Sequence, residues 1–235
     1  MLIRQLFDST SSTYTYLLAD QGQAVLIDPV KDKLDDYLRL LAELGLTLRL
    51  AIDSHTHADH ITALGDLRAA TGCASGFGEP CLAHCTSFTF KDGQQLPFGT
   101  RHLLVWHTPG HTDDSYCFLL PPAGEEPWQL FSGDTLLIRG TGRTDFQNGD
   151  PRQQWASLQR LLALPDSTRV LPAHDYKGWS SSTLAEERRH NPRLQVADAE
   201  AYAILMNNLH LPLPGLMDIA VPANRACGRE EGGGL

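Results

Sequence analysis

The chain has 235 residues and a formal net charge of −9, and 42% of its residues are hydrophobic against 20% charged. This is an ordinary globular composition in a chain long enough to bury its own core, which excludes disorder, collagen and coiled coil. No stretch approaches the roughly 18 apolar residues needed to cross a bilayer, and the acidic balance disfavours a nucleic-acid binder, so no membrane or nucleic-acid partner is expected.

Hydrophobic patterning predicts strands interrupted by helices along the chain. Strands are expected at residues 14–19, 24–28, 48–53, 102–108, 115–120, 129–133 and 169–172, and helices at 32–44, 61–70, 151–164, 183–190 and 197–208. This order indicates an α/β chain whose sheets are covered by helices. We expect a single domain over residues 1–235, with a C-terminal helical extension at about 179–235.

The N-terminus and the cysteines bear on the compartment. Met1 to Asp8 lack the basic start, apolar run and cleavage site of a secretory signal, so a cytoplasmic protein is expected. Five cysteines are present: Cys73, Cys81, Cys85, Cys117 and Cys227. An odd number without CxxC pairs predicts neither a disulfide framework nor a zinc ribbon. Cys227 has two interpretations, a modifiable thiol near a pocket or, more commonly, a small buried hydrophobe.

Four candidate metal ligands fall within six residues: His55, His57, Asp59 and His60. They directly follow the apolar strand expected at 48–53, and a strand end is a rigid support from which a turn can aim side chains inward. Imidazole nitrogen and carboxylate oxygen together suit zinc, iron or manganese. A single histidine is more often a surface or core residue, so the clustering favours a metal site.

Three more candidates, His111, Asp134 and His174, each follow an apolar strand elsewhere in the chain. Clustered histidines and an aspartate would be costly to bury unpaired, so packing alone explains the whole set of seven poorly. The sequence therefore predicts a metal site built from strand ends.

The seven residues form a recognisable signature, His55-x-His57-x-Asp59-His60 followed by His111, Asp134 and His174. This signature resembles that of the metallo-β-lactamase superfamily. The resemblance implies an αββα sandwich with the metal site at one edge of its two sheets. Hydrolases, lactonases and oxygenases share the signature, so it indicates the fold more specifically than the reaction.

A second set of motifs is similar to the persulfide dioxygenase family. It comprises Leu136–Gln147, Pro172–Tyr176, Glu187–Arg193 and Asp218–Asn224, and the likeness extends over nearly the whole chain. The resemblance implies that glutathione persulfide reacts with O2 and water to give sulfite and glutathione. It also implies a homodimer.

By this resemblance, one Fe(II) per chain is bound by His55, His111 and Asp134. Two histidines and one carboxylate on one face leave positions open for reactants, as in non-haem oxygenases. The other four candidates then orient these ligands or hold a second metal: His57, Asp59, His60 and His174. The chain departs from the human-type pattern after His111, where Asp113 and Asp114 replace Pro and Gly.

Candidate substrate-binding residues follow from the chemistry of glutathione, which carries two carboxylates and one ammonium. Arg139 and Arg143 come shortly after the metal aspartate, and Tyr176 comes just after His174. Arginine can grip a carboxylate with two parallel hydrogen bonds, and it can equally brace a loop through backbone carbonyls. Both roles are open for the two arginines.

Two other functions are compatible with the sequence. A glyoxalase-II-type thioester hydrolase with two zinc ions would use all seven ligands and would also take a glutathione conjugate. A metal-bound sensor or scaffold is the non-enzymatic alternative, which an incomplete ligand set would favour. The stretch Gly142–Phe146 and the C-terminal Pro222–Asn224 favour the dioxygenase over both.

Overall fold

The computed structural model of the chain describes residues 1–81, 83, 85–212 and 215–228. Within them the strands form two six-stranded sheets, ordered β1-β2-β3-β4-β5-β6 and β12-β11-β10-β9-β8-β7. The chain divides into two compact units. The first comprises Met1–Phe90, Pro97–His102 and the described part of Leu213–Leu235, and the second comprises Lys91–Leu96 and Leu103–Pro212.

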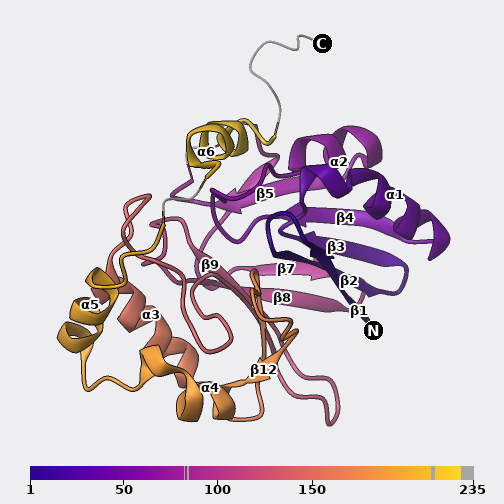
Figure 1. The fold of residues 1–235 in the computed structure, drawn as a ribbon. Helices are drawn as coiled ribbons and strands as arrows, with labels where there is room; N and C mark the ends of the chain where they lie inside the picture. The colour runs from indigo at the N-terminus through magenta and orange to yellow at the C-terminus, as the bar shows by residue number, and fades with distance from the viewer. Residues whose placement is uncertain (82, 84, 213–214, 229–235) are drawn as a thin grey trace. The chain divides into compact units, whose positions relative to one another are not determined.

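The first unit contains the first sheet and three α-helices (Figure 1). Its strands are β1 (Leu2–Asp8), β2 (Thr13–Asp20), β3 (Gln23–Ile27), β4 (Thr47–Ile52), β5 (Ala74–Gly78) and β6 (Phe88–Phe90), and its helices are η1 (Lys31–Lys33), α1 (Leu34–Glu43), α2 (Leu64–Thr71) and α6 (Met217–Arg225). Strands β1 to β3 pair antiparallel and β3 to β6 pair parallel. Parallel neighbours need crossover connections, which α1 and α2 supply. The carboxyl ends of β3 and β4 therefore reach the same edge of the sheet.

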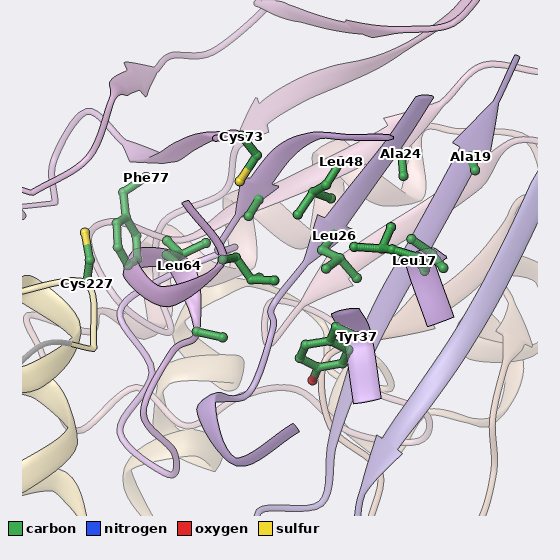
Figure 2. Packing of buried hydrophobic residues seen from close by; sticks show 14 residues of the cluster. Leu17, Ala19, Ala24, Leu26, Tyr37, Leu48, Leu64, Cys73, Phe77 and Cys227 are labelled. Atoms are coloured by element: carbon green, nitrogen blue, oxygen red, sulfur yellow. The ribbon is translucent and has the colours of Figure 1, made fainter. Parts of the chain in front are cut away.

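The core of this unit forms where helices α1 and α2 meet the sheet (Figure 2). Leu17 and Leu26 come from the strands, Tyr37 and Leu41 from α1, and Leu64 from α2, and all are at least 95% buried. Tyr37 and Leu41 are four residues apart and therefore share one face of their helix. The spacing of Leu34, Leu38, Leu41 and Leu44 predicts the helix, but of these four only Leu41 is buried, while Leu44 is 41% exposed.

The second unit contains most of the second sheet with its own helices. Its strands are β8 (Arg101–His107), β9 (Tyr116–Leu120), β10 (Gln129–Gly133), β11 (Arg169–Pro172) and β12 (Ser182–Thr183), and its helices are α3 (Pro151–Leu162), α4 (Leu184–His190), η2 (Pro192–Leu194) and α5 (Ala199–Asn207). The boundary between the two units falls within β7 (Gln95–Phe98) and at the start of β8. Strands β10 and β11 pair parallel, while β9 and β12 pair antiparallel with their neighbours. The ends of β10 and β11 thus lie next to each other.

Helices α3 and α5 cover the second core. Leu158 and Leu161 of α3 are fully buried together with Tyr202 of α5 and Val170 of β11. Helix α3 begins as the sequence predicts, with Pro151 in its first turn. The residue before it caps the helix, because the Asp150 carboxylate accepts hydrogen bonds from two backbone N–H groups at 2.7 and 3.0 Å.

Most of the predicted elements are present within a few residues of their expected bounds, and the α/β class is confirmed. Strands β1, β5, β6, β7 and β12 were not predicted. Strand β5 reads Ala-Ser-Gly-Phe-Gly and β7 contains Pro97, so neither has the β-branched or aromatic composition of a recognisable strand. Of the predicted C-terminal extension, α4 and α5 belong to the second unit and α6 to the first, while residues 229–235 lie outside the described residues.

The prediction that the cysteines form no disulfide is wrong for one pair. Cys85 and Cys227 are joined in a disulfide with their Cα atoms 5.9 Å apart, although 142 residues separate them in the chain. The pairing follows from the position of α6 against the first unit, which sequence spacing does not encode. Cys227 is buried as expected, with an exposed fraction of 0%, but as a disulfide partner and not as a lone cysteine. No helix within the described ranges is long and apolar enough to span a bilayer.

The packing of α3 gives a stability prediction. Replacement of Leu158 by Ala leaves a cavity between α3 and the sheet, so we expect the free energy of unfolding to fall by about 2–5 kcal/mol in urea titrations. Ile204, on the exposed face of α5 with 65% exposure, is the matched control. Its replacement by Ala should change the free energy by no more than about 0.5 kcal/mol. Equal effects of the two substitutions would contradict the assignment of this core.

Candidate metal centre

The first unit presents the histidine-rich loop directly after β4. The imidazole rings of His55, His57 and His60 gather closely, with centroids 4.1 Å apart for the first pair and 4.3 Å for the second. Asp59 bonds His60 Nδ1 through Oδ2 at 2.8 Å and accepts from the Thr13 hydroxyl at 3.1 Å. The four candidates of this loop are therefore brought together, as the sequence predicts.

A carboxylate at the end of β3 holds the start of this loop. Asp28 Oδ1 accepts from the Ser54 backbone N–H at 2.6 Å, and Asp28 Oδ2 accepts from the Ser54 hydroxyl at 3.0 Å. Since the hydroxyl hydrogen points to Asp28, the Ser54 oxygen accepts from His55 Nδ1, 2.9 Å away. This chain of hydrogen bonds fixes the tautomer in which His55 Nε2 carries the lone pair that a metal needs.

Asp28 also contacts His57, whose Nε2 lies 3.2 Å from Asp28 Oδ1. Complete burial disfavours the charged imidazole, but the neighbouring carboxylates, chiefly Asp28, outweigh this effect and raise the pKa of His57 to about 9. Ligand atoms of Asp28, Asp53 and His57 lie within 4.8 Å of one another. Sequence patterning did not single out Asp28 or Asp53, and the one available signal was their position at the ends of two predicted strands.

The second unit presents His111, Asp134 and His174 at the ends of its own strands. His174 Nδ1 lies 2.6 Å from Asp134 Oδ1, and His111 Nε2 lies 3.5 Å from Asp134 Oδ2. One carboxylate thus contacts both imidazoles, one through each oxygen. These three sequence-predicted residues are also brought together by the fold.

The tautomer of His111 is set by its other ring nitrogen. His111 Nδ1 donates to the backbone carbonyl of Arg143 at 2.7 Å, so Nε2 carries the lone pair beside Asp134 Oδ2. Two ligand atoms that bind one ion at about 2.1 Å in a tetrahedral or octahedral arrangement are roughly 3 Å apart, which is close to this separation. The pair can therefore bind a single metal ion with little movement.

The loop of residues 137–143 packs directly on these ligands. Gly142 donates its N–H to the Asp134 carbonyl at 2.7 Å. A Cβ atom at this position would lie 2.4 Å from that carbonyl oxygen and 2.7 Å from His111 Nδ1, so only glycine allows so close an approach. The glycine in this motif is therefore a geometric requirement of the site.

A cavity of about 430 Å³ opens beside the ligands of the second unit. It is lined by His111, Asp134, residues 137–143, residues 174–177, Arg193, Leu211 and Pro212. All three predicted substrate-binding residues, Arg139, Arg143 and Tyr176, are among the lining residues. Four fixed cations line it against two carboxylates, so the cavity is locally basic in an acidic chain.

Arg193 and Lys177 are the cations that sequence reasoning missed. Arg193 Nη1 donates to the carbonyl and hydroxyl oxygens of Thr141, which are neutral partners and do not balance its charge. Burial lowers the pKa of the Arg193 guanidinium from its usual value. Its position in the motif Glu187–Arg193 was the signal that could have identified it.

Arg139 braces the wall of the cavity. Its guanidinium pairs with the fully buried Glu187 and, at 2.8 Å, with the half-exposed Glu186. The Glu187 carboxylate also accepts from the Arg139 backbone N–H at 2.8 Å and from Asn191 Nδ2 at 2.9 Å. Asn191 Nδ2 in turn lies 2.9 Å from the carbonyl of Gly140. Glu187 and Asn191 therefore hold the loop of residues 137–143 in place.

Arg143 braces its surroundings and also lines the cavity. Its guanidinium donates two hydrogen bonds to the Asp145 carboxylate at 2.7 and 2.8 Å and a third to the Pro212 carbonyl at 2.6 Å. It also lies over the ring of Phe146 at 4.3 Å. The Arg143 hydrogen bond lowers the pKa of Asp145 from its usual value. The side chain remains part of the cavity wall.

The segment that departs from the human-type pattern forms a locally closed turn. Thr112 Oγ1 donates to Asp114 Oδ1 at 2.6 Å, and the Thr112 N–H donates to Ser115 Oγ at 3.1 Å. Asp113 accepts from Asn148 Nδ2 at 2.9 Å. The two aspartates thus make hydrogen bonds within the turn and to its neighbour, and the contact between His111 and Asp134 is retained.

Comparison with known proteins places the chain in a family. The family model of the metallo-beta-lactamase superfamily matches residues 9–77 and 87–174. The chain is 42% identical over 232 residues to the human persulfide dioxygenase ETHE1, mitochondrial, covering 97% of this chain and 89% of that protein. The chain therefore belongs to the metallo-β-lactamase superfamily and, within it, to the family of the persulfide dioxygenases.

Two further similarities bear on the fold and on the alternative function. The crystal structure of ETHE1 from Myxococcus xanthus is 50% identical, with a TM-score of 0.92 over 97% of this chain and 100% of that chain. The fold predicted from the seven-residue signature is thereby confirmed. A hydroxyacylglutathione hydrolase from Thermosynechococcus vestitus is 35% identical over 201 residues, covering 83% of this chain and 76% of that protein.

The bracing of the cavity wall can be tested with two neighbouring glutamates. Replacement of Glu187 by Gln weakens the buried partner of Arg139, so the free energy of unfolding should fall by about 1–3 kcal/mol. Glu186 pairs with the same guanidinium but is 51% exposed. Its replacement by Gln should cost less than about 1 kcal/mol. The reverse ranking in urea titrations would contradict the bracing role of Glu187.

Proposed function

We propose that this protein is a persulfide dioxygenase that uses one Fe(II) per chain and takes glutathione persulfide as its substrate. The reaction converts one glutathione persulfide, one O2 and one water into glutathione and sulfurous acid, which ionises to sulfite. Both oxygen atoms of O2 and the oxygen of water end in the sulfite, and the persulfide S–S bond is broken. The terminal sulfur is oxidised and O2 is reduced.

The observation that carries this proposal is the similarity to persulfide dioxygenases along nearly the entire chain. The identity of 42% over 97% of the chain exceeds the 35% identity to the hydroxyacylglutathione hydrolase over 83% of the chain. The locally basic cavity beside the histidine and aspartate ligands is consistent with a substrate that carries two carboxylates.

The donor set fits an iron ion. We propose His55, His111 and Asp134 as its ligands, because two imidazoles and one carboxylate are the donors of non-haem Fe(II) oxygenases. Hydrogen bonds at Nδ1 prepare both histidines to bind through Nε2, and Asp134 keeps Oδ2 for the metal while Oδ1 contacts His174. When bound, the iron would supply the redox chemistry through which the persulfide reacts with O2.

The chain's own residues bind and orient the substrate. Arg143, Arg193 and Lys177 attract the glutathione carboxylates into the cavity, since each presents a positive charge on its wall. Tyr176, whose ring stacks on that of His174 with an interplanar angle of 2°, borders the cavity beside the proposed ligands. His174 donates from Nδ1 to Asp134 and thereby keeps that carboxylate oriented.

The remaining candidate ligands fit a supporting role. His57 contacts Asp28, and His60 contacts Asp59, so these imidazoles have carboxylate partners within the protein. The higher identity to the human persulfide dioxygenase than to the hydroxyacylglutathione hydrolase supports one iron per chain over the two zinc ions of a glyoxalase-II-type hydrolase. Metal analysis of protein purified without added metal distinguishes the two, because the hydrolase requires two ions per chain.

The ligand assignment predicts that metal and activity are lost together. Replacement of His111 or Asp134 by Ala removes a donor, so both variants should lose bound iron and persulfide-dependent oxygen uptake. Oxygen uptake and sulfite are measured in the same anaerobically iron-loaded sample after addition of glutathione persulfide. A His111→Ala protein with full iron content and full turnover would refute the assignment. Oxygen uptake without sulfite formation by the unaltered protein would refute the proposed reaction.

Arg143 is expected to bind the substrate. Replacement by Ala should raise the apparent KM about tenfold, equivalent to about 1.4 kcal/mol of binding energy, and leave the iron content unchanged. Arg152, which is 58% exposed and pairs with Glu200 on the surface, is a matched control that should leave KM unchanged. Loss of folding in the Arg143 variant with an unaltered KM in the folded fraction would instead assign it a bracing role.

The homodimer and the cytoplasmic location expected from the sequence stay predictions. Sedimentation equilibrium of the purified protein tests the homodimer, because a dimer has twice the mass of the 25.9 kDa chain.

A further inference from the structure

The C-terminal helix α6 docks on the loop that carries the histidine cluster, and this contact lies wholly within the first unit. The backbone N–H of Gly65, at the start of α2, donates to the carbonyl of Cys227 at 3.0 Å. The Lys31 ammonium donates to the carbonyl of Gly228. Figure 2 shows Cys227 at the end of α6, near the helix that bears Leu64. The end of the chain is therefore fixed beside the segment that joins the histidine loop to α2.

Asn224 of α6 bonds the histidine loop at three backbone positions. Its Nδ2 donates to the carbonyls of His57 at 2.8 Å and His60 at 2.9 Å. Its Oδ1 accepts from the backbone N–H of Thr62 at 2.8 Å. Both amide hydrogens and the amide oxygen are thus engaged, and the side chain is completely buried.

These bonds matter because the loop is not held by a helix or a sheet. Residues 53–60 contain no helix or strand, so the carbonyls of His57 and His60 have no place in a regular backbone ladder. A buried carbonyl without a partner would cost free energy, and a side-chain amide satisfies two of them at once. Asn224 thereby fixes the backbone on both sides of Asp59.

Two features position Asn224 itself. Gly228 approaches Thr62 so closely that a Cβ atom there would lie 2.0 Å from the Thr62 carbonyl oxygen, and its φ of +76° also favours glycine. The disulfide between Cys85 and Cys227 ties the end of α6 to the segment after β5, and the Arg68 guanidinium holds the Cys85 carbonyl in turn. The helix end is therefore anchored covalently three residues beyond Asn224.

We propose that Asn224 is a positioning residue for the metal-binding loop, and that the Cys85–Cys227 disulfide keeps it in place. Asn224 contacts backbone rather than substrate or the reacting atoms, so it acts through the loop. The inference rests on the proposed function only in that this loop supplies a metal ligand. Sequence reasoning used the Pro222–Asn224 motif as a family marker and gave it no physical role.

The test compares Asn224→Asp with Asn208→Asp, the same chemical change at an exposed position of the second unit. The Asp side chain keeps the shape of Asn but loses both donor hydrogens and places a carboxylate against two carbonyls. We expect the dissociation constant of Fe(II), measured anaerobically by competition with a chromogenic chelator, to rise about 10–100-fold in Asn224→Asp. It should be unchanged in Asn208→Asp.

Amide hydrogen exchange of the metal-free protein supplies a readout independent of metal and turnover. Backbone amides of residues 53–62 should lose protection in Asn224→Asp, because its carboxylate repels the carbonyls of His57 and His60 instead of donating to them. Core amides of β3 and β4 should keep theirs. Unaltered iron affinity in the folded variant would overturn the proposal. Weakened iron affinity with unchanged hydrogen exchange in the loop would also overturn it, because Asn224 would then affect iron binding by a route other than the loop backbone.

The variant Cys85→Ser keeps the proposal testable if Asn224→Asp does not fold. It removes the covalent tether and leaves the three Asn224 hydrogen bonds available, so the iron dissociation constant should rise above that of the unaltered protein. Thr62 exchange should rise in parallel. No change in either quantity would overturn the role of the disulfide. Failure of the proposed function would appear differently, as iron bound normally by the unaltered protein without sulfite formation.

Discussion

Parallel pairing of two strands places the chemically active residues of each unit. Strands β3 and β4 end at one edge of the first sheet, where Asp28 meets His57 at 3.2 Å. Strands β10 and β11 end together in the second sheet, where Asp134 meets His174 at 2.6 Å. In each unit a carboxylate after one strand thus contacts an imidazole after its parallel neighbour. Each carboxylate directly follows a rigid strand, which fixes where it meets its imidazole partner.

The cavity of the second unit differs in charge from the chain as a whole. The chain is acidic overall, yet the cavity beside Asp134 and His111 gathers four of its cations. Two of them, Arg139 and Arg143, are also tied to carboxylates that shape the wall. Arg193 instead bonds neutral oxygens of Thr141 and so retains the charge that a carboxylate substrate would neutralise. The structure therefore distinguishes Arg139 and Arg143, which pair with carboxylates, from Arg193, which bonds neutral oxygens of Thr141.

The C-terminal helix extends the same principle of support to the histidine loop. Asn224 and the disulfide of Cys227 lie more than 150 residues beyond His57 in the sequence, yet the Asn224 side chain bonds its backbone carbonyl. A loop that binds metal must hold its ligands before the ion arrives, since ordering them on binding would reduce affinity. The contacts of α6 supply that order without adding a ligand.

Local patterns determined the element types, the ligand candidates and the family. Apolar spacing identified helix α1, and the four candidates from His55 to His60 lie within six residues, so neither needed tertiary information. Tertiary structure alone decided the contacts between distant segments: Asp28 with Ser54, Glu187 with Arg139, and Cys85 with Cys227. The reason is physical. The periodicity of apolar residues reports which face of a helix or strand is buried. Contacts between distant segments depend instead on how the chain connects its elements, and no local sequence pattern encodes those connections.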